Sequence, residues 1–232
     1  MKILIFSDLH GKIENIESFL FLNKEIGHYV FAGDFFGYFV ADRRLADFVK
    51  KLRPEFVIGN HDVYYLQEIL GKSALKSIGP IESRLMSSEE YQNKYGALVE
   101  TSEHARGEDF HFLQNAGLNK KVTIDGVRFF ICHGSPEDPL EGYIYPDDPG
   151  IEQYYERYEF DVLVLGHTHK AFISSRGGRS ILNPGSCTLP RGEGAKPSVI
   201  LYETNLRKAT MVELEQRLNY VRDGKNRVRL LS

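Results

Sequence analysis

The amino-acid sequence predicts an α/β fold in which two β-sheets form a sandwich flanked by helices. In the first third of its 232 residues, short apolar runs alternate with helical stripes, which is typical of parallel strands joined by right-handed crossovers. In the second half, apolar runs are joined by glycine-containing turns, which is typical of β-hairpins. At this length and 42% hydrophobic content, one domain over residues 1–232 with a sizeable core is expected.

The first third is expected to supply three strands and two helices. Its first run, Ile3 to Phe6, is continuously apolar, as expected for a strand that is covered on both faces. Both helices are expected from apolar residues at helical spacing, and Pro54 ends the second one. The expected strands are 2–7, 29–32 and 56–58, and the expected helices are 13–24 and 42–52.

Residues 63–116 differ in composition, with many Glu, Ser, Lys and Tyr residues and no strong strand pattern. Helical stretches are expected near 63–70, 87–103 and 107–115. We interpret this segment as a helical insertion beside the functional site. The alternative, that it only covers one face of a sheet, stays open at this point.

The rest of the chain returns to strands, most of them paired in hairpins. Asp125-Gly126 is a two-residue turn of the kind that joins hairpin strands, and Gly177-Gly178 is expected to form another. A short polar helix is expected before the strand at 161–165. The expected strands are 121–124, 127–132, 161–165, 171–174, 180–182, 198–203 and 209–214, with a further edge strand at 227–231.

Composition and charge argue against several classes of function. A net charge of −3 leaves no basic surface of the kind that binds duplex nucleic acid. No segment reaches the roughly 20 apolar residues that cross a membrane, and no signal peptide is expected because the N-terminus opens into a strand. The two cysteines, Cys132 and Cys187, are too few for a disulfide framework. They suggest a reducing compartment, so a cytoplasmic protein is expected.

Polar side chains that can bind metals follow five of the expected strands. Strand ends converge on one edge of a sheet, so residues that are far apart in the sequence can meet there. Carboxylates, an amide and imidazoles gathered in this way predict a site for two divalent cations. The seven candidate ligands are Asp8, His10, Asp34, Asn60, His133, His167 and His169.

These motifs differ in how specific they are. An Asp at a strand end, such as Asp8, is commonly just the N-cap of the next helix. The stretch Gly59-Asn60-His61-Asp62 is more specific, because a turn built from Gly and Asn does not explain the following His and Asp. Asn60 offers an amide oxygen as a ligand. His61 would face the substrate, and Asp62 would orient the His61 ring.

Taken together, the motifs resemble those of the calcineurin-like metallophosphoesterase superfamily. The resemblance covers residues 3–203 without the insertion, and it implies a four-layer αββα sandwich. His133-Gly134-Ser135-Pro136 and Asn183-Pro184-Gly185-Ser186 resemble the small prokaryotic phosphodiesterase branch. Phosphoprotein phosphatases usually end the third motif in Glu, so Asp62 disfavours that role. The motifs are Asp8-x-His10, Gly33-Asp34, Gly59-Asn60-His61-Asp62, His133-Gly134 and Gly166-His167-Thr168-His169.

The resemblance also implies roles for the ligands. Asp8, His10 and His169 would hold one cation. Asn60, His133 and His167 would hold the other, and Asp34 would bridge the two. Manganese is the favoured metal, with iron, cobalt, nickel and zinc as alternatives. A hydroxide between the cations would attack the phosphorus atom, and His61 would donate a proton to the leaving oxygen.

The expected function is that of a metal-dependent phosphoesterase, with a phosphodiesterase favoured. Its substrate would be a small phosphoester, and a nucleotide-derived compound is one candidate. Phe35, Tyr38 and Arg191 are candidate substrate contacts, although both aromatic residues fit core or lid packing equally well. The alternatives are a phosphomonoesterase acting on a nucleotide or phosphoprotein and a protein-binding scaffold, as in the retromer subunit that shares this fold. Assembly into a homo-oligomer is left open.

Overall fold

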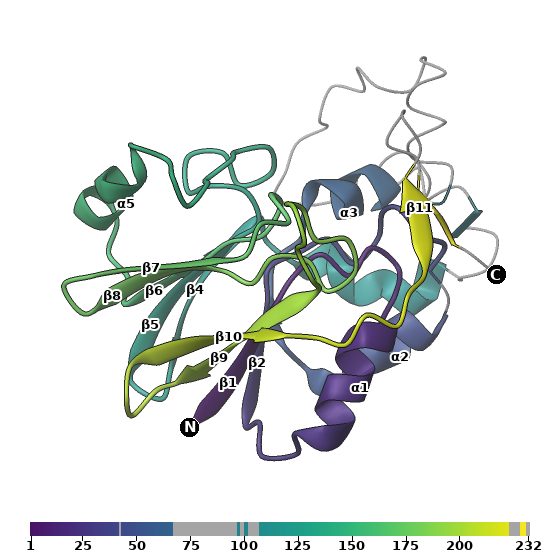
Figure 1. Cartoon of the computed structure of the whole chain (residues 1–232), viewed down its shortest axis with the longest axis horizontal. Coiled ribbons are helices and arrows are strands. Elements are labelled where there is room, and N and C mark those ends of the chain that lie inside the picture. Colours follow the sequence, from purple (N-terminus) through teal and green to yellow (C-terminus); the bar gives the residue numbers. More distant parts are fainter. Residues whose placement is uncertain (42, 67–96, 98–99, 102–106, 223–227, 231–232) are drawn as a thin grey trace.

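Two five-stranded β-sheets pack face to face in the computed structural model of the chain (Figure 1). The structure describes residues 1–232 except for 42, 67–96, 98–99, 102–106, 223–227 and 231–232. Most of the expected helical insertion therefore lies outside the described residues. Within the described part, no helix combines the length and the apolar character that crossing a membrane requires.

The first sheet has the strand order β10-β9-β1-β2-β3. Strands β1, β2 and β3 are parallel and adjacent, which confirms the predicted crossovers, and β9 and β10 extend the sheet in antiparallel pairing. The strands are β1 (Lys2–Phe6), β2 (His28–Phe31), β3 (Glu55–Phe56), β9 (Ser198–Glu203) and β10 (Lys208–Glu213). Their helices are α1 (Glu14–Leu22), α2 (Arg43–Leu52), α3 (Asn60–Tyr64) and the 3-10 helix η2 (Gly107–Asn115).

The second sheet has the order β4-β5-β6-β8-β7, with three parallel strands inside and one antiparallel strand at each edge. Its elements are β4 (Asn119–Ile124), β5 (Val127–Cys132), α5 (Ile151–Arg157), β6 (Val162–Val164), β7 (Phe172–Arg176) and β8 (Arg179–Asn183). The predicted strands of both sheets are confirmed to within two residues at each end. The expected strand at 227–231 is present as β12 (Val228–Leu230), but it is not an edge strand of either large sheet. It pairs with β11 (Tyr220–Arg222) in a separate sheet.

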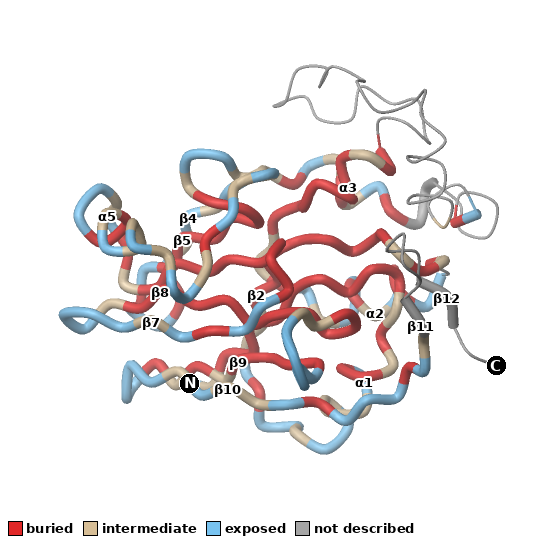
Figure 2. Tube along the Cα trace, turned by 45° about the horizontal axis from the view of Figure 1, so that its top comes forward, coloured by how far each residue is buried: buried red, intermediate tan, exposed pale blue. Residues whose placement is uncertain are grey.

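Alternating side chains of β1 show how the four layers form. Ile3 and Ile5 pack between the two sheets, whereas Leu4 and Phe6 pack under the helices, and all four are fully buried. Burial of one such side chain stabilises the fold by about 1.5–3 kcal/mol. Figure 1 shows α1 and α2 outside the first sheet and α5 outside the second. Figure 2 shows the strands as buried traces and the hairpin ends as exposed ones.

Both predicted hairpin turns have the backbone that their residues favour. Asp125 and Gly126 have φ values of 49° and 76°, and Gly177 and Gly178 have values of 58° and 77°. Positive φ at both central residues defines the mirror-image turn whose twist matches that of the flanking strands. These turns fix the register of β4 with β5 and of β7 with β8, and thereby place the ends of β5 and β8.

Candidate metal centre

The seven predicted ligands lie together, as expected, where strands of both sheets end. Asp8 and His10 follow β1, Asp34 follows β2, and Asn60 is the first residue of α3. The remaining three belong to the second sheet: His133 follows β5, and His167 and His169 follow β6. All seven side chains are buried, with at most 7% of any residue exposed.

The backbone of these loops is strained at the ligands themselves. Five of the seven ligands have a left-handed backbone, with φ between 47° and 64°. Such residues lie in a sparsely populated region and are held there by the surrounding structure, typically at functional sites. Here two loops hold each other, because the Asp8 amide donates to the Gly33 carbonyl at 3.0 Å and the His10 amide to the Asp34 carbonyl at 3.1 Å. The five residues are Asp8, His10, Asp34, His167 and His169.

The donor atoms of the ligands converge. Asp8 Oδ1 lies 3.2 Å from His169 Nε2 and 3.6 Å from His10 Nε2. Asp34 Oδ2 lies 3.3 Å from His133 Nε2 and 3.8 Å from His10 Nε2. The Asp34 carboxylate is therefore next to a histidine of each predicted ligand group.

Backbone carbonyl groups fix the orientation of three of the imidazole rings. The Nδ1 atoms of His10, His133 and His169 donate to the carbonyl oxygens of Phe36, Ala32 and Leu189, at 2.7 to 2.9 Å. A carbonyl oxygen can only accept, so each Nδ1 carries a proton, and in a neutral ring the lone pair of Nε2 then faces into the site. The Nε2 atoms of His10 and His169 face each other at 2.9 Å. A cation would satisfy these two facing lone pairs.

Several ligand atoms are buried without a hydrogen-bond partner. They are both carboxylate oxygens of Asp8, Oδ1 of Asn60, and Nε2 of His133 and His167. Buried polar atoms are almost always satisfied, so five such atoms at predicted ligand positions require an explanation. This mixed set of nitrogen and oxygen donors fits divalent cations such as Mn, Fe, Co, Ni or Zn.

The electrostatics of the site also favour a cation. Burial by itself raises the pKa of Asp34, but the neighbouring imidazoles of His133 and His61 lower this pKa below its ordinary value. Burial and the nearby His133 lower the pKa of His167 to about 4, and burial lowers that of His169. Burial by itself lowers the pKa of His133, but the Asp34 carboxylate outweighs burial and raises this pKa to about 10. The ionised Asp34 carboxylate and the neutral imidazoles of His167 and His169 are in the protonation states that bind metals, and a bound cation would displace the proton on His133 Nε2.

Asp62 holds the backbone around the predicted ligands. Both of its oxygens accept backbone hydrogen bonds, from the amides of Asp34 and Gly59 to Oδ2 and from that of Phe36 to Oδ1, at 2.9 to 3.0 Å. The side chain thus ties the loop after β2 to the start of α3. Asp62 therefore positions the backbone on both sides of the cluster, and its role in orienting the His61 ring stays a prediction.

A second group of polar side chains forms hydrogen bonds to the loops that carry the predicted ligands. The Asp8 carbonyl accepts hydrogen bonds from the hydroxyl groups of Ser186 and Thr188, at 2.8 and 3.1 Å. Asn183 Nδ2 donates to the Gly166 carbonyl at 2.7 Å. The sequence singled out 183–186 only by resemblance, and the structure shows that these residues hold the strained loops of both sheets.

A cavity of about 270 Å³ opens over four of the predicted ligands. Two predicted substrate contacts line it, and Arg191 Nη2 donates to the hydroxyl of Tyr38 at 3.3 Å. Tyr64 and Glu141 also line the cavity and were not predicted from the sequence. Tyr64 lies one helical turn after His61, so helical spacing could have placed both on one face of α3, whereas nothing in the sequence marked Glu141. The lining residues are Asp34, Tyr38, Asn60, His61, Tyr64, Glu141, Tyr143, His167, His169 and Arg191.

The third predicted substrate contact, Phe35, is wrong. Its side chain is fully buried, and its ring centroid lies 4.2 Å from that of Phe31 and 5.6 Å from that of Phe56. Phe36 is also fully buried and stacks on Tyr65 at 4.0 Å. The chain after Asp34 directs both phenylalanines into the core under the helices. Tyr38 is the first aromatic residue after Asp34 that reaches the cavity.

The comparisons with known proteins agree with this geometry. A family model described as the calcineurin-like phosphoesterase superfamily domain matches residues 1–207. The chain belongs to this superfamily. A curated relative of the chain, an uncharacterized protein of Methanocaldococcus jannaschii, is 26% identical over 248 aligned positions, which cover 97% of the chain and 93% of the relative.

Solved structures share the fold of the chain. A metallophosphoesterase from Sphaerobacter thermophilus is 23% identical, with a TM-score of 0.69 over 94% of the chain and 90% of its own length. A structure described as a novel archaeal phosphodiesterase is 19% identical, with a TM-score of 0.52 over 92% of the chain and 100% of its own length. At these identities the similarity establishes the four-layer sandwich.

Metal binding is expected to stabilise the protein. Added Mn²⁺ should raise the melting temperature of metal-stripped protein by roughly 5–10 °C, because a ligand at about 100 times its Kd stabilises the native state by about 2.7 kcal/mol. A thermal melt after dialysis against a chelator, with and without each cation, measures the shift. Ca²⁺ should act more weakly because it prefers sites made of oxygen atoms. Equal melting temperatures with and without all of the transition metals would contradict the prediction.

Proposed function

We propose that this phosphoesterase is a metal-dependent phosphodiesterase that hydrolyses small phosphate diesters. The observation that carries the proposal is a cluster of ligand atoms without hydrogen-bond partners, two of whose residues, Asn60 and His167, line a cavity together with His61. One divalent cation would be held by Asp8, His10 and His169. A second would be held by Asn60, His133 and His167, and both would be bound by Asp34. When bound, such cations supply Lewis-acid charge for the phosphate oxygens and for the activation of water.

We propose that His61 donates a proton to the leaving oxygen. Its side chain lines the cavity, and its ring centroid lies 5.1 Å from that of Tyr38 and 5.0 Å from that of His10. A group with this task must reach the substrate, whereas Asp62 below it is fully buried and holds the backbone. Asp62 would therefore act through the position of Asp34 and His61.

The charges and rings around the cavity favour a diester over a monoester. The Glu141 carboxylate and the Tyr64 hydroxyl form a hydrogen bond of 2.5 Å at the rim. This carboxylate repels a second negative charge on the substrate, so the singly charged diester is preferred to the dianionic monoester. The rings of Tyr38, Tyr64 and Tyr143 would offer apolar surface to the two ester groups, which suits a nucleotide-derived substrate.

Parallel assays test the proposal. Metal-stripped protein is incubated with Mn²⁺, Fe²⁺, Co²⁺, Ni²⁺ or Zn²⁺, and each sample is assayed with bis-p-nitrophenyl phosphate and with p-nitrophenyl phosphate. We expect the highest turnover of the diester with Mn²⁺. Faster turnover of the monoester would replace the proposal with a phosphomonoesterase, and no turnover with any cation would favour a protein-binding role.

Both cysteines are free and buried, so we infer a reducing compartment, the cytoplasm, for the enzyme.

Arg191 is expected to bind a phosphate oxygen of the substrate. Replacing Arg191 with Ala should raise the KM for the diester by roughly 10- to 100-fold, because a charge-assisted hydrogen bond contributes about 1.5–3 kcal/mol, and should change kcat less. Steady-state kinetics measure both constants. Arg157→Ala, on the exposed side of α5, is the matched control. A fall in kcat at unchanged KM would give Arg191 a different role.

A further inference from the structure

The last turn of α1 is apolar on every side. Phe19, Leu20, Phe21 and Leu22 are consecutive, and successive residues of a helix point about 100° apart, so the four cover its whole circumference. The core accepts only Phe19 and Leu20, which pack against it and are partly buried. Phe21 is 74% exposed and Leu22 79%, the highest values for large hydrophobic residues in the described part of the chain. A helix that is apolar all round is normally covered on all sides.

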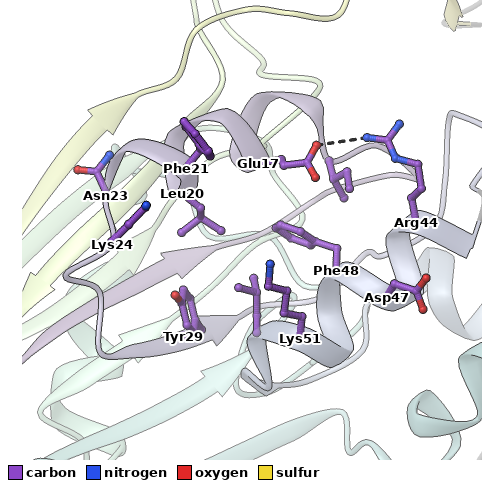
Figure 3. A pocket seen from close by; sticks show the side chains of 12 residues that line it. Glu17, Leu20, Phe21, Asn23, Lys24, Tyr29, Arg44, Asp47, Phe48 and Lys51 are labelled. Atoms are coloured by element: carbon purple, nitrogen blue, oxygen red, sulfur yellow. Dashed lines mark hydrogen bonds and ion pairs between the residues drawn. The ribbon is translucent and has the colours of Figure 1, made fainter.

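An apolar groove lies beside these two residues. It has a volume of about 600 Å³ and separates α1 from α2 (Figure 3). Leu20, Tyr29, Phe48 and Leu52 line it, and all four pack on the core while remaining partly exposed. Figure 3 shows Leu20 and Phe48 directed into the groove and Phe21 directed away from Leu20. One surface thus combines a projecting apolar side chain with an apolar hollow.

Charges of both signs surround the groove. Glu17 and Asp47 are acidic, and Lys24, Arg44 and Lys51 are basic. Glu17 and Arg44 form an ion pair across the groove at 3.2 Å (Figure 3). A surface of this kind matches neither a strongly acidic nor a strongly basic partner. It does match a copy of itself, because a two-fold rotation can bring the acidic positions of one copy opposite the basic positions of the other.

We propose that this surface, the α1–α2 patch, is the interface of a two-fold symmetric dimer of this chain. The patch consists of Phe21, Leu22 and the groove between α1 and α2. In the dimer, Phe21 of each copy enters the groove of the other, as an interface that pairs one patch with itself requires. Two-fold dimers are the most common assemblies of identical chains, and exposed apolar patches commonly mark such contacts.

The α1–α2 patch lies away from the metal ligands. Helix α1 starts after Asp8 and His10 and runs back from the end of β1 toward the start of β2, so Phe21 lies near the opposite edge of the sheet (Figure 1). A dimer formed through this patch leaves the cavity open. The inference goes beyond the proposed catalysis and stands without it.

Sedimentation velocity of the full chain from low to high micromolar concentration tests the dimer. We expect the wild-type chain to sediment as a dimer at high concentration. Phe21→Glu should raise the dissociation constant by roughly 100-fold or more, because a carboxylate would have to enter an apolar groove. The control is Leu206→Glu, on the turn between β9 and β10, where Leu206 is 60% exposed. It should sediment as the wild-type chain does.

Each result decides the proposal. A monomeric wild-type chain at the highest concentration, or a dimer that Phe21→Glu leaves intact, overturns it. At a concentration low enough for the wild-type chain to be monomeric, the melting temperature and the phosphoesterase rate of Phe21→Glu should match those of the wild-type chain and thereby show that it folds. If that variant does not fold, hydrogen exchange of the wild-type chain at low and high concentration replaces it. Exchange must then slow with concentration at 19–24 and 47–52, and equal rates there overturn the interface.

Discussion

Replacing Asp34 with Asn is expected to abolish both metal binding and turnover. Asp34 Oδ2 lies 3.3 Å from His133 Nε2 and 3.8 Å from His10 Nε2, between the two predicted ligand groups. The neutral amide cannot balance the charge of two cations, and one of its two polar atoms becomes a donor that repels them. We expect metal affinity to fall by at least about 100-fold and kcat/KM by at least about 1,000-fold.

Elemental analysis after dialysis gives the metal content, and steady-state kinetics with bis-p-nitrophenyl phosphate give kcat/KM. Asp125→Asn is the matched control, because Asp125 also has a left-handed backbone, with a φ of 49°, but lies in the hairpin turn between β4 and β5. The control should retain its metal and its rate. An Asp34→Asn variant that kept two cations per chain would show that this carboxylate does not hold them both.

The strands and the convergence of the seven candidate ligands could be predicted because both depend on local sequence pattern. A strand that is covered on both faces must be apolar throughout, and the run from Ile3 to Phe6 shows this directly. The polar residue that ends such a run lies at the sheet edge whatever the loop does next. Because parallel strands end at the same edge, the sequence placed Asp8 and Asp34 together without any knowledge of the loops.

The conformation of the loops could not be predicted in the same way. The left-handed backbone of Asp8 depends on hydroxyl groups of Ser186 and Thr188, which are remote in the sequence. Gly59 is needed because a Cβ atom there would collide with the Asp34 carboxylate, and that neighbour is visible only in the fold. The same holds for Phe35, because the direction of the chain after Asp34 decides whether an aromatic ring enters the core or the cavity.

Replacing His61 with Ala is expected to leave the metal content unchanged and to lower kcat by about 10² to 10⁴-fold, the usual range for loss of a general acid. His61 follows Asn60 in α3 and lines the cavity. A ring nitrogen of His61 also lies within 4.8 Å of ligand atoms of His10 and Asp34, close enough for His61 to be a metal ligand itself. The metal content of the variant therefore distinguishes the two roles.

A second comparison isolates proton transfer from general damage to the site. An ester with a p-nitrophenyl leaving group needs little protonation, whereas an alkyl leaving group needs it fully, so the loss in His61→Ala should grow with the pKa of the leaving alcohol. His111→Ala, an exposed histidine in η2, should show neither loss nor dependence. If the loss is the same for every leaving group, His61 stabilises the transition state by charge alone. If the variant also lacks one cation, His61 is a ligand, and the ligand set of the centre has to be enlarged by one residue.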